Sequence, residues 1–119
     1  MNAVTMPHGT CWSVIPTIDA MFVACDLMAA GAVQAITATG RRVPQDVAVV
    51  GFDDSIAAVC TNPLLSTLRV PIEQMAADAT RILLDGDPDF GFRRFYPVEL
   101  ILRDSAPDHS PAPVLLPAA

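Results

Sequence analysis

The segment Val47–Asp54, with the sequence Val-Ala-Val-Val-Gly-Phe-Asp-Asp, decides the fold class of this chain. Its four leading residues are apolar without alternation, a pattern typical of a strand that is buried on both faces. The run stops at Gly51, and two adjacent carboxylates, Asp53 and Asp54, follow one residue later. Parallel sheets covered by helices bury their strands in this way, and ligands bind beyond the carboxyl ends of such strands. The segment therefore predicts an α/β fold with a candidate site at its carboxyl end.

The residues before this segment complete a crossover unit. Apolar residues at Asp19–Ala24 predict a short strand, and the periodicity of Leu27–Thr39 predicts a helix. Asp26 is placed to cap that helix, and Gly40 is placed to end it. A strand, a helix and a second strand within about 30 residues are typical of a right-handed parallel crossover.

Four further elements are predicted after the decisive segment. They are a helical turn at Ile56–Cys60, which Asp54 would cap, a strand at Ser66–Val70, an amphipathic helix at Ile72–Asp85, and an edge strand at Tyr96–Arg103. The apolar residues of the predicted amphipathic helix are Ile72, Met75, Ala76, Ala79 and Leu83. We expect an irregular lead-in at residues 1–16, one folded unit at 17–105, and a disordered tail rich in proline and alanine at 106–119.

Composition limits the functions open to the chain. Its formal net charge is −6, and all seven basic residues are arginines. Nucleic-acid binding requires a basic patch that displaces counterions, so this chain is not expected to grip DNA by itself. The hydrophobic fraction of 52% and the mean hydropathy of +0.43 are high for 119 residues, which indicates either an unusually complete core or apolar surface intended for a partner.

Cysteine usage and hydropathy indicate a cytoplasmic protein. The three cysteines are an odd number without metal-ligand spacing, as expected of free thiols in a reducing compartment. No segment approaches the roughly 18 continuous apolar residues of a membrane span. The first 16 residues do not have the pattern of a secretory signal. No membrane partner is therefore expected.

The paired carboxylates Asp53 and Asp54 also admit a metal-binding or catalytic interpretation. Hard cations require several oxygen ligands in one place, and phosphoryl transfer requires a positive group as well. A phospho-acceptor receiver domain relies on a lysine, and this chain has none. No nucleophile with a partnering base is found either. We assign no catalytic residue, metal ligand or cofactor, and we expect a protein that is not an enzyme.

Four segments together resemble bacterial transcription regulators of the lactose-repressor/galactose-repressor (LacI/GalR) family. They are the residues 20–36 (AMFVACDLMAAGAVQAI), 40–54 (GRRVPQDVAVVGFDD), 63–69 (PLLSTLR) and 99–105 (ELILRDS). The resemblance runs from about Thr17 to Ser105. It implies a mostly parallel α/β fold, namely part of the C-terminal lobe of a type I periplasmic-binding-protein module.

The resemblance also implies a function. Such modules hold a small effector, a sugar or related metabolite, in a cleft between two lobes and transmit its presence to DNA-binding heads. The helix-turn-helix and the first lobe are expected to be absent from these residues, so operator DNA would be reached only through a domain not present here. The alternatives are a stand-alone small-molecule-binding or interaction module, and a truncated remnant without function.

Individual roles follow from the family pattern. Asp53 matches the carboxylate that accepts hydrogen bonds from effector hydroxyls. Cys25 stands where the family typically has an asparagine, and Val70 where it often has a glutamine, which favours a more apolar effector.

Three apolar residues, Leu27, Met28 and Ile56, are candidates for the surface that faces a second subunit in this family. In the family the helix corresponding to Ile72–Asp85 packs on the first lobe. With that lobe absent, we expect its apolar face to be exposed and the chain to self-associate.

Overall fold

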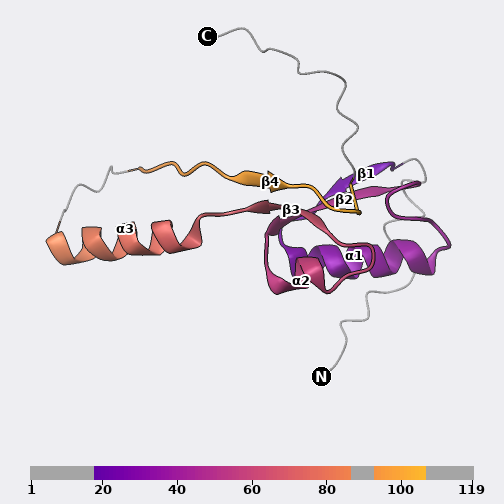
Figure 1. The fold of residues 1–119 in the computed structure, drawn as a ribbon, viewed down its shortest axis with the longest axis horizontal. Helices are drawn as coiled ribbons and strands as arrows, with labels where there is room; N and C mark the ends of the chain where they lie inside the picture. Colours follow the sequence, from indigo (N-terminus) through magenta and orange to yellow (C-terminus); the bar gives the residue numbers. More distant parts are fainter. Residues whose placement is uncertain (1–17, 87–92, 107–119) are drawn as a thin grey trace, which may run out of the picture.

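The computed structural model describes residues 18–86 and 93–106, which form a four-stranded sheet with helices on one face (Figure 1). The strands lie in the order β1 (Ala20–Phe22), β2 (Ala48–Asp53), β3 (Ser66–Arg69) and β4 (Glu99–Ile101). The first three strands are parallel, and β4 is antiparallel to β3. The predicted α/β fold with a mostly parallel sheet is therefore confirmed.

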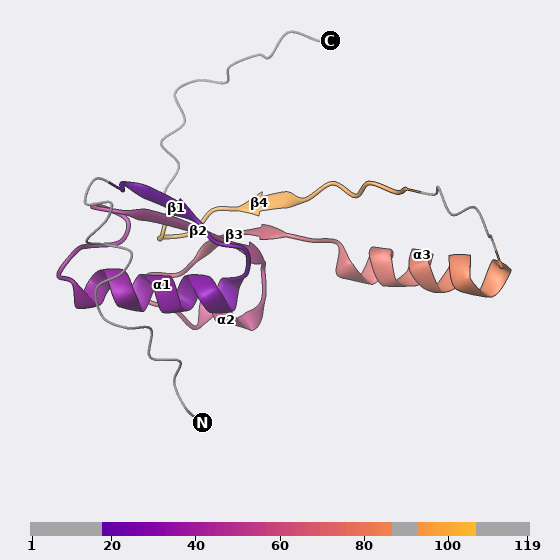
Figure 2. The ribbon, with the colours of Figure 1, turned by 180° about the vertical axis from the view of Figure 1, so that it is seen from behind.

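Two helices cover one face of the sheet. Helix α1 (Asp26–Ala38) and the single turn α2 (Ile56–Val59) lie side by side beneath the strands (Figures 1 and 2). Gly40 follows the end of α1 with a φ of +82°, as predicted for a residue that ends a helix. The buried core between this layer and the sheet consists of Val23, Ala29, Val33, Ile36, Val47, Val49, Ala58 and Leu65.

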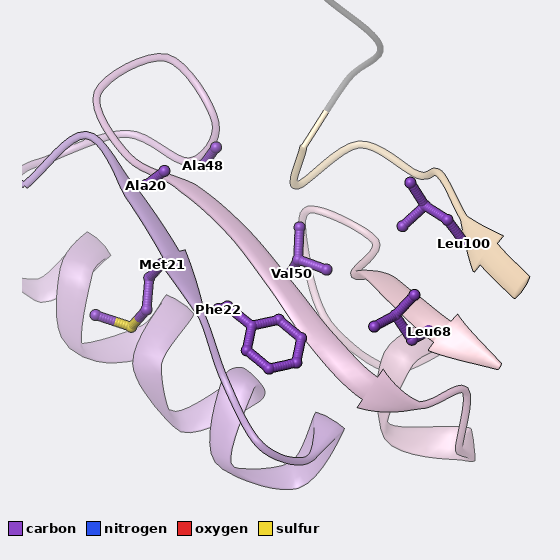
Figure 3. A pocket seen from close by; sticks show the side chains of 7 residues that line it. All are labelled: Ala20, Met21, Phe22, Ala48, Val50, Leu68 and Leu100. Carbon is purple, nitrogen blue, oxygen red and sulfur yellow. The ribbon is translucent and has the colours of Figure 1, made fainter. Parts of the chain in front are cut away.

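The opposite face of the sheet is apolar and, among the described residues, uncovered. Figure 3 shows the shallow depression on this side, lined by Ala20, Met21, Phe22, Ala48, Val50, Leu68 and Leu100. We call this side the open sheet face, and Phe52 belongs to it through its contact with Phe22. Phe22 packs edge-on against Phe52, with ring centroids 6.4 Å apart, yet 61% of Phe22 is exposed. The prediction that both faces of β2 are buried is therefore wrong within the described ranges.

Helix α3 (Ile72–Asp85) projects from the sheet as an arm (Figures 1 and 2). It has the bounds predicted from sequence, and all five residues of its predicted apolar face are exposed. Asp78, on another side of the helix, is 6% exposed. It accepts hydrogen bonds from Arg81 and Tyr96, and Arg94 approaches it to 3.2 Å. The polar side of α3 is thus tied to the returning segment 93–98, while the apolar side faces solvent.

Every element except α3 differs from its predicted bounds by one to three residues, and sheet pairing explains the changes in β2 and β4. Strand β2 does not end at Gly51 but continues to Asp53, because Gly51, Phe52 and Asp53 all pair with β3. The last strand is shorter than the predicted Tyr96–Arg103, because only Glu99–Ile101 have partners on the short strand β3.

Candidate functional site

The carboxyl ends of the three parallel strands meet at one edge of the sheet, which we call the carboxyl edge. Phe22, the last residue of β1, lies opposite Val50 of β2, and Cys25 follows three residues after the end of β1. Asp53 lies opposite Arg69, one residue before Val70. The fold thus brings the three predicted effector contacts, Cys25, Asp53 and Val70, to the same edge.

The backbone at this edge adopts a conformation that L-residues rarely take. Asp53 has a φ of +108° and Asp54 a φ of +54°. Positive φ at a non-glycine residue costs on the order of 1–3 kcal/mol and persists only where the surroundings hold it. Such positions gather at functional sites, so the turn at Asp53–Asp54 is a candidate site on geometric grounds as well.

Asp54 holds this turn in place. Its carboxylate accepts a hydrogen bond of 2.6 Å from Nη2 of Arg103 and one of 2.7 Å from Nε of Arg69. The hydrogen bond from Arg103, followed by that from Arg69, holds the pKa of Asp54 below its usual value. The prediction that Asp54 caps the turn at Ser55 is wrong, because both carboxylate oxygens are engaged by arginines and α2 has no side-chain cap. Asp54 is a structural anchor.

Asp26 forms a second anchor, beneath the sheet. It is fully buried, and its carboxylate accepts hydrogen bonds from the Thr67 hydroxyl at 2.5 Å and from the backbone amide of Ser55 at 2.7 Å. The predicted capping role is wrong, because Cys25 is the N-cap of α1 and makes no side-chain cap bond. The carboxylate of Asp26 instead joins the start of α1 to β3 and to the residue after the Asp53–Asp54 turn.

Glycine is required at position 51 by this close approach. A Cβ on Gly51 would lie 2.3 Å from Oδ1 of Asp26 and 2.9 Å from the side chain of Leu65. The absence of a side chain at Gly51 lets the Asp26 carboxylate pass over β2 to Thr67. The glycine therefore shapes the carboxyl edge and does not end the strand.

Asp53 differs from both anchors because its carboxylate is not engaged. Within residues 18–86 and 93–106, no side-chain hydrogen bond or ion pair involves Asp53, which is half-buried. Cys25 and Val70 are also half-buried. An ionised carboxylate is an acceptor with several lone pairs, so Asp53 can bind two adjacent hydroxyl groups of a ligand. The described ranges contain no cluster of side chains suited to a metal ion.

The predicted dimer residues lie on the helical layer, at the starts of the two helices that follow this edge. Leu27 and Met28 in the first turn of α1 and Ile56 at the start of α2 are all exposed, with Leu27 and Ile56 more than three-quarters accessible. Leu27 and Ile56 line a groove between α1 and α2 together with Ala30, Ala57 and Cys60. None of the helices in the described ranges has the length and apolarity of a membrane span.

Sequence reasoning missed three residues that shape the site, namely Thr67, Arg69 and Arg103. The sequence offered only a weak signal for them, because each is simply a polar residue inside or beside a predicted strand. They meet the carboxylates only once the sheet has formed. The sequence predicts structural roles for their partners Asp26 and Asp54, but it assigns them helix-capping hydrogen bonds that the structure does not contain.

The fold is of the α/β class, and its candidate ligand site lies at the carboxyl ends of parallel strands, where such folds bind ligands. Residues 2–106 match the family of periplasmic binding protein-like domains. The chain belongs to this family, in the form found in LacI/GalR-type transcriptional regulators.

Three comparisons illustrate the relationship. The transcriptional regulator CelR of Thermobifida fusca is 40% identical over 93 residues, which are 76% of this chain and 27% of CelR. The structure of a CelR–cellobiose complex superposes with a TM-score of 0.74 at 38% identity, covering 80% of this chain and 30% of that one. The lac repressor dimer bound to operator and an anti-inducer gives a TM-score of 0.63 at 36% identity, covering 76% and 32%. The chain thus spans about a quarter to a third of the length of these proteins.

Proposed function

We propose that this chain is the effector-sensing and dimerising part of a LacI/GalR-type transcriptional regulator, in which the carboxyl edge is one wall of the effector site. Its effector is a sugar or a related metabolite, and its role is binding, not catalysis. CelR and the lac repressor, which share the fold, are a cellobiose-bound regulator and an operator-bound dimer, and this likeness supports the proposal.

One observation carries the proposal: at an edge where every neighbouring carboxylate is engaged, the Asp53 carboxylate is not. Asp54 binds two arginines and Asp26 binds Thr67 and Ser55, whereas Asp53 has no partner among the described residues. The anchors fix the positive φ of Asp53 before any ligand arrives. A preorganised acceptor loses little freedom on binding, which favours recognition of hydroxyl groups.

The neighbours of Asp53 restrict the effector. Cys25 offers a thiol that is not bonded to the helix it precedes, and Val70 offers two methyl groups. Neither is a strong hydrogen-bond partner. We therefore propose an effector that presents adjacent hydroxyls to Asp53 and a less polar surface to Cys25 and Val70.

Signalling in the complete regulator requires two states with different effector affinity. Effector binding at the carboxyl edge would favour one arrangement of lobes, and a dimer formed through Leu27, Met28 and Ile56 would pass this shift to operator DNA. The exposure of these three residues, beside the groove between α1 and α2, supports this surface as the dimer contact.

Binding of simple sugars to the whole chain tests the effector site. We expect cellobiose or glucose to bind with a millimolar dissociation constant, since only one wall of the site is supplied, and to perturb the amide NMR signals of Cys25, Asp53 and Val70. Asp53→Asn should weaken binding about 10–100-fold, because it removes a charge-assisted hydrogen bond.

Asp104→Asn is the matched control. Asp104 is an exposed carboxylate that follows the antiparallel strand β4, so it lies at the opposite end of the sheet. The Asp104→Asn variant should leave sugar binding unchanged. Equal losses in both variants, or sugar-induced shifts confined to other elements, would contradict an effector site at Asp53.

A further inference from the structure

We propose that Thr67 is a positioning residue for effector recognition. Its buried hydroxyl holds the Asp53–Asp54 turn in the strained conformation that presents the Asp53 carboxylate to a ligand. The inference rests on the proposed effector site at Asp53, and it adds the residue that sets the affinity of that site. Thr67 acts from the buried side of the turn, without touching the effector.

The conformation of the turn has to be held against the preference of its own backbone. Asp53 has a φ of +108° and Asp54 a φ of +54°, both in the region that L-residues rarely adopt. Residues persist in such conformations only where surrounding contacts over-determine them. Without these contacts the two residues would relax to negative φ, and the Asp53 carboxylate would leave its place at the carboxyl edge.

The Thr67 hydroxyl begins a chain of hydrogen bonds that ends on this turn. It donates to one oxygen of Asp26 at 2.5 Å, and the other oxygen of Asp26 accepts the Ser55 amide at 2.7 Å. The hydroxyl oxygen also accepts the Asp54 amide in a longer contact of 3.4 Å. One hydroxyl group thus holds both amides that follow Asp53, the first directly and the second through Asp26.

The orientation of the Asp26 carboxylate depends on Thr67. Within residues 18–86 and 93–106, Thr67 is the only side chain that bonds to Asp26. Removal of the hydroxyl would leave a buried oxygen of Asp26 without a donor, which is costly enough to turn the carboxylate toward another partner. The bond from Asp26 to the Ser55 amide would then weaken, and the turn would lose both of its buried contacts.

Burial separates this role from direct contact with the effector. Thr67 is fully buried, whereas Asp53 is half-buried at the carboxyl edge. The side chains of Arg103 and Arg69, which bind the Asp54 carboxylate, are 17% and 51% exposed and could meet an effector themselves. A change of effector affinity caused at Thr67 therefore reports on the conformation of the turn alone.

Glucose titrations of the whole chain and of two Thr67 variants test the proposal. Thr67→Val removes the hydroxyl at nearly constant volume, whereas Thr67→Ser keeps it. If about one Thr67→Val molecule in ten keeps the turn, the apparent dissociation constant rises about 10-fold, because only that fraction is competent to bind. Thr67→Ser should bind glucose with an affinity close to that of the wild type.

Ser105→Ala is the matched control. The Ser105 hydroxyl is also fully buried and also joins β2 to β3, since it accepts the Ser66 amide at 2.7 Å and donates to the Val49 carbonyl at 2.6 Å. These bonds lie toward the amino ends of the two strands, away from the turn. Ser105→Ala should lower the free energy of unfolding, as Thr67→Val does, but leave the glucose affinity of the folded chain unchanged.

The backbone of Asp53 provides a second measurement that requires no sugar. A strong nuclear Overhauser effect between the amide and Hα protons of one residue marks a positive φ, because these protons come closest there. We expect a strong effect for Asp53 in the wild type, Thr67→Ser and Ser105→Ala, and a weak one in Thr67→Val. If Thr67→Val does not fold, Thr67→Cys replaces it, because a thiol is a weaker donor of similar size.

Three results would overturn the proposal. An unchanged Overhauser effect at Asp53 in Thr67→Val would show that the arginines bound to Asp54 hold the turn by themselves. Equal losses of glucose affinity in Thr67→Val and Thr67→Ser would show that the hydroxyl is not the group that matters. An equal loss in Ser105→Ala would assign the effect to a general loosening of the sheet.

Failure of the proposed effector site has a different signature. A wild-type chain that binds neither glucose nor cellobiose would contradict that site, while the Overhauser effect at Asp53 would still decide whether Thr67 positions this residue.

Discussion

The carboxylate of Asp26, at the start of α1, accepts the hydroxyl hydrogen of Thr67 on β3 by passing directly over Gly51 of the intervening strand. Gly51 and Thr67 are paired neighbours in the sheet, and the O···O distance between Asp26 and Thr67 is 2.5 Å. The other oxygen of Asp26 accepts the Ser55 amide, two residues after Asp53. One buried carboxylate thereby connects the helix, two strands and the turn that presents the candidate effector contact.

Replacing Asp26 by alanine should destabilise the whole module. The change leaves the fully buried Thr67 hydroxyl without its acceptor, which costs about 1–3 kcal/mol, and it also removes the acceptor of the Ser55 amide. We expect the free energy of unfolding in urea to fall by about 2–5 kcal/mol. Asp104→Ala, at an exposed carboxylate, is the control and should change it by less than about 0.5 kcal/mol. Equal effects of the two substitutions on the free energy of unfolding would show that the hydrogen bonds of the Asp26 carboxylate do not stabilise the fold.

Gly51→Ala should destabilise the module through overpacking. The new methyl group would overlap Oδ1 of Asp26 and press on Leu65, so the Asp26–Thr67 bond must lengthen or β2 must shift. We expect a loss of about 1–3 kcal/mol in urea unfolding. The matched control is Gly31→Ala, in the middle of α1 with open space around it, which should stabilise by about 0.5–1 kcal/mol. A Gly51→Ala variant as stable as wild type would contradict the packing described at this position.

Local sequence patterns predicted the elements well but predicted contacts between elements poorly. The bounds of α3 follow from apolar periodicity, and the end of α1 follows from Gly40, because both are decided within a few turns of chain. The sequence predicts that Asp26 caps a helix, because it precedes the predicted helix at Leu27–Thr39. Its true partner Thr67 lies 41 residues away and is brought to it only by the parallel register of β2 and β3.

The sequence predicts where the candidate site lies, but not which hydrogen bonds hold its residues in place. The sequence indicates Asp53 and Asp54 as the end of a buried strand, and the structure places them at the carboxyl edge as expected. Which carboxylate is engaged depends on Arg103, which lies 49 residues after Asp54 and reaches it only because β4 is antiparallel to β3. The prediction that both faces of β2 are buried was also wrong. An apolar run indicates that a strand packs against other elements, but it does not show which elements cover it.

The Asp54–Arg103 pair should give the module a measurable dependence on pH. Because the pKa of Asp54 is lowered in the folded state, chiefly by the hydrogen bond from Arg103, the pair stabilises the fold above the unfolded pKa of about 3.9. That contribution is lost as the pH falls through the lower folded pKa. Arg103→Gln should lower stability by about 1–3 kcal/mol at pH 7. The difference from wild type should shrink on acidification below about pH 4.

A double-mutant cycle isolates this effect. In an Asp54→Asn background no carboxylate titrates at this position, so Arg103→Gln should then cost the same at pH 7 and at pH 3. Urea unfolding of the four proteins at both pH values provides the measurement. A pH-dependent difference that survives in the Asp54→Asn background would assign the titration to another group.

The link between Asp78 and Tyr96 should be visible in the titration of the tyrosine. Burial of the hydroxyl, and then its hydrogen bond to Asp78, raise the pKa of Tyr96 above its ordinary value of 10.0. Since the folded pKa is raised, the stability that this group contributes is complete below pH 10 and is lost as the pH rises through the folded pKa. Tyr96 is the only tyrosine of the chain, so ultraviolet absorbance reports its ionisation directly.

We expect Asp78→Asn to lower the pKa of Tyr96 without restoring it fully, because burial remains. The same variant should increase hydrogen exchange in α3 but not in α1, since Asp78 is the only buried residue of α3 and ties that helix to the returning segment. Asp85→Asn, at the exposed last residue of α3, should change neither quantity. A Tyr96 that titrates at its ordinary pKa in the wild-type chain would show that the arm is not held by this bond, and α3 would then be free to approach its own sheet.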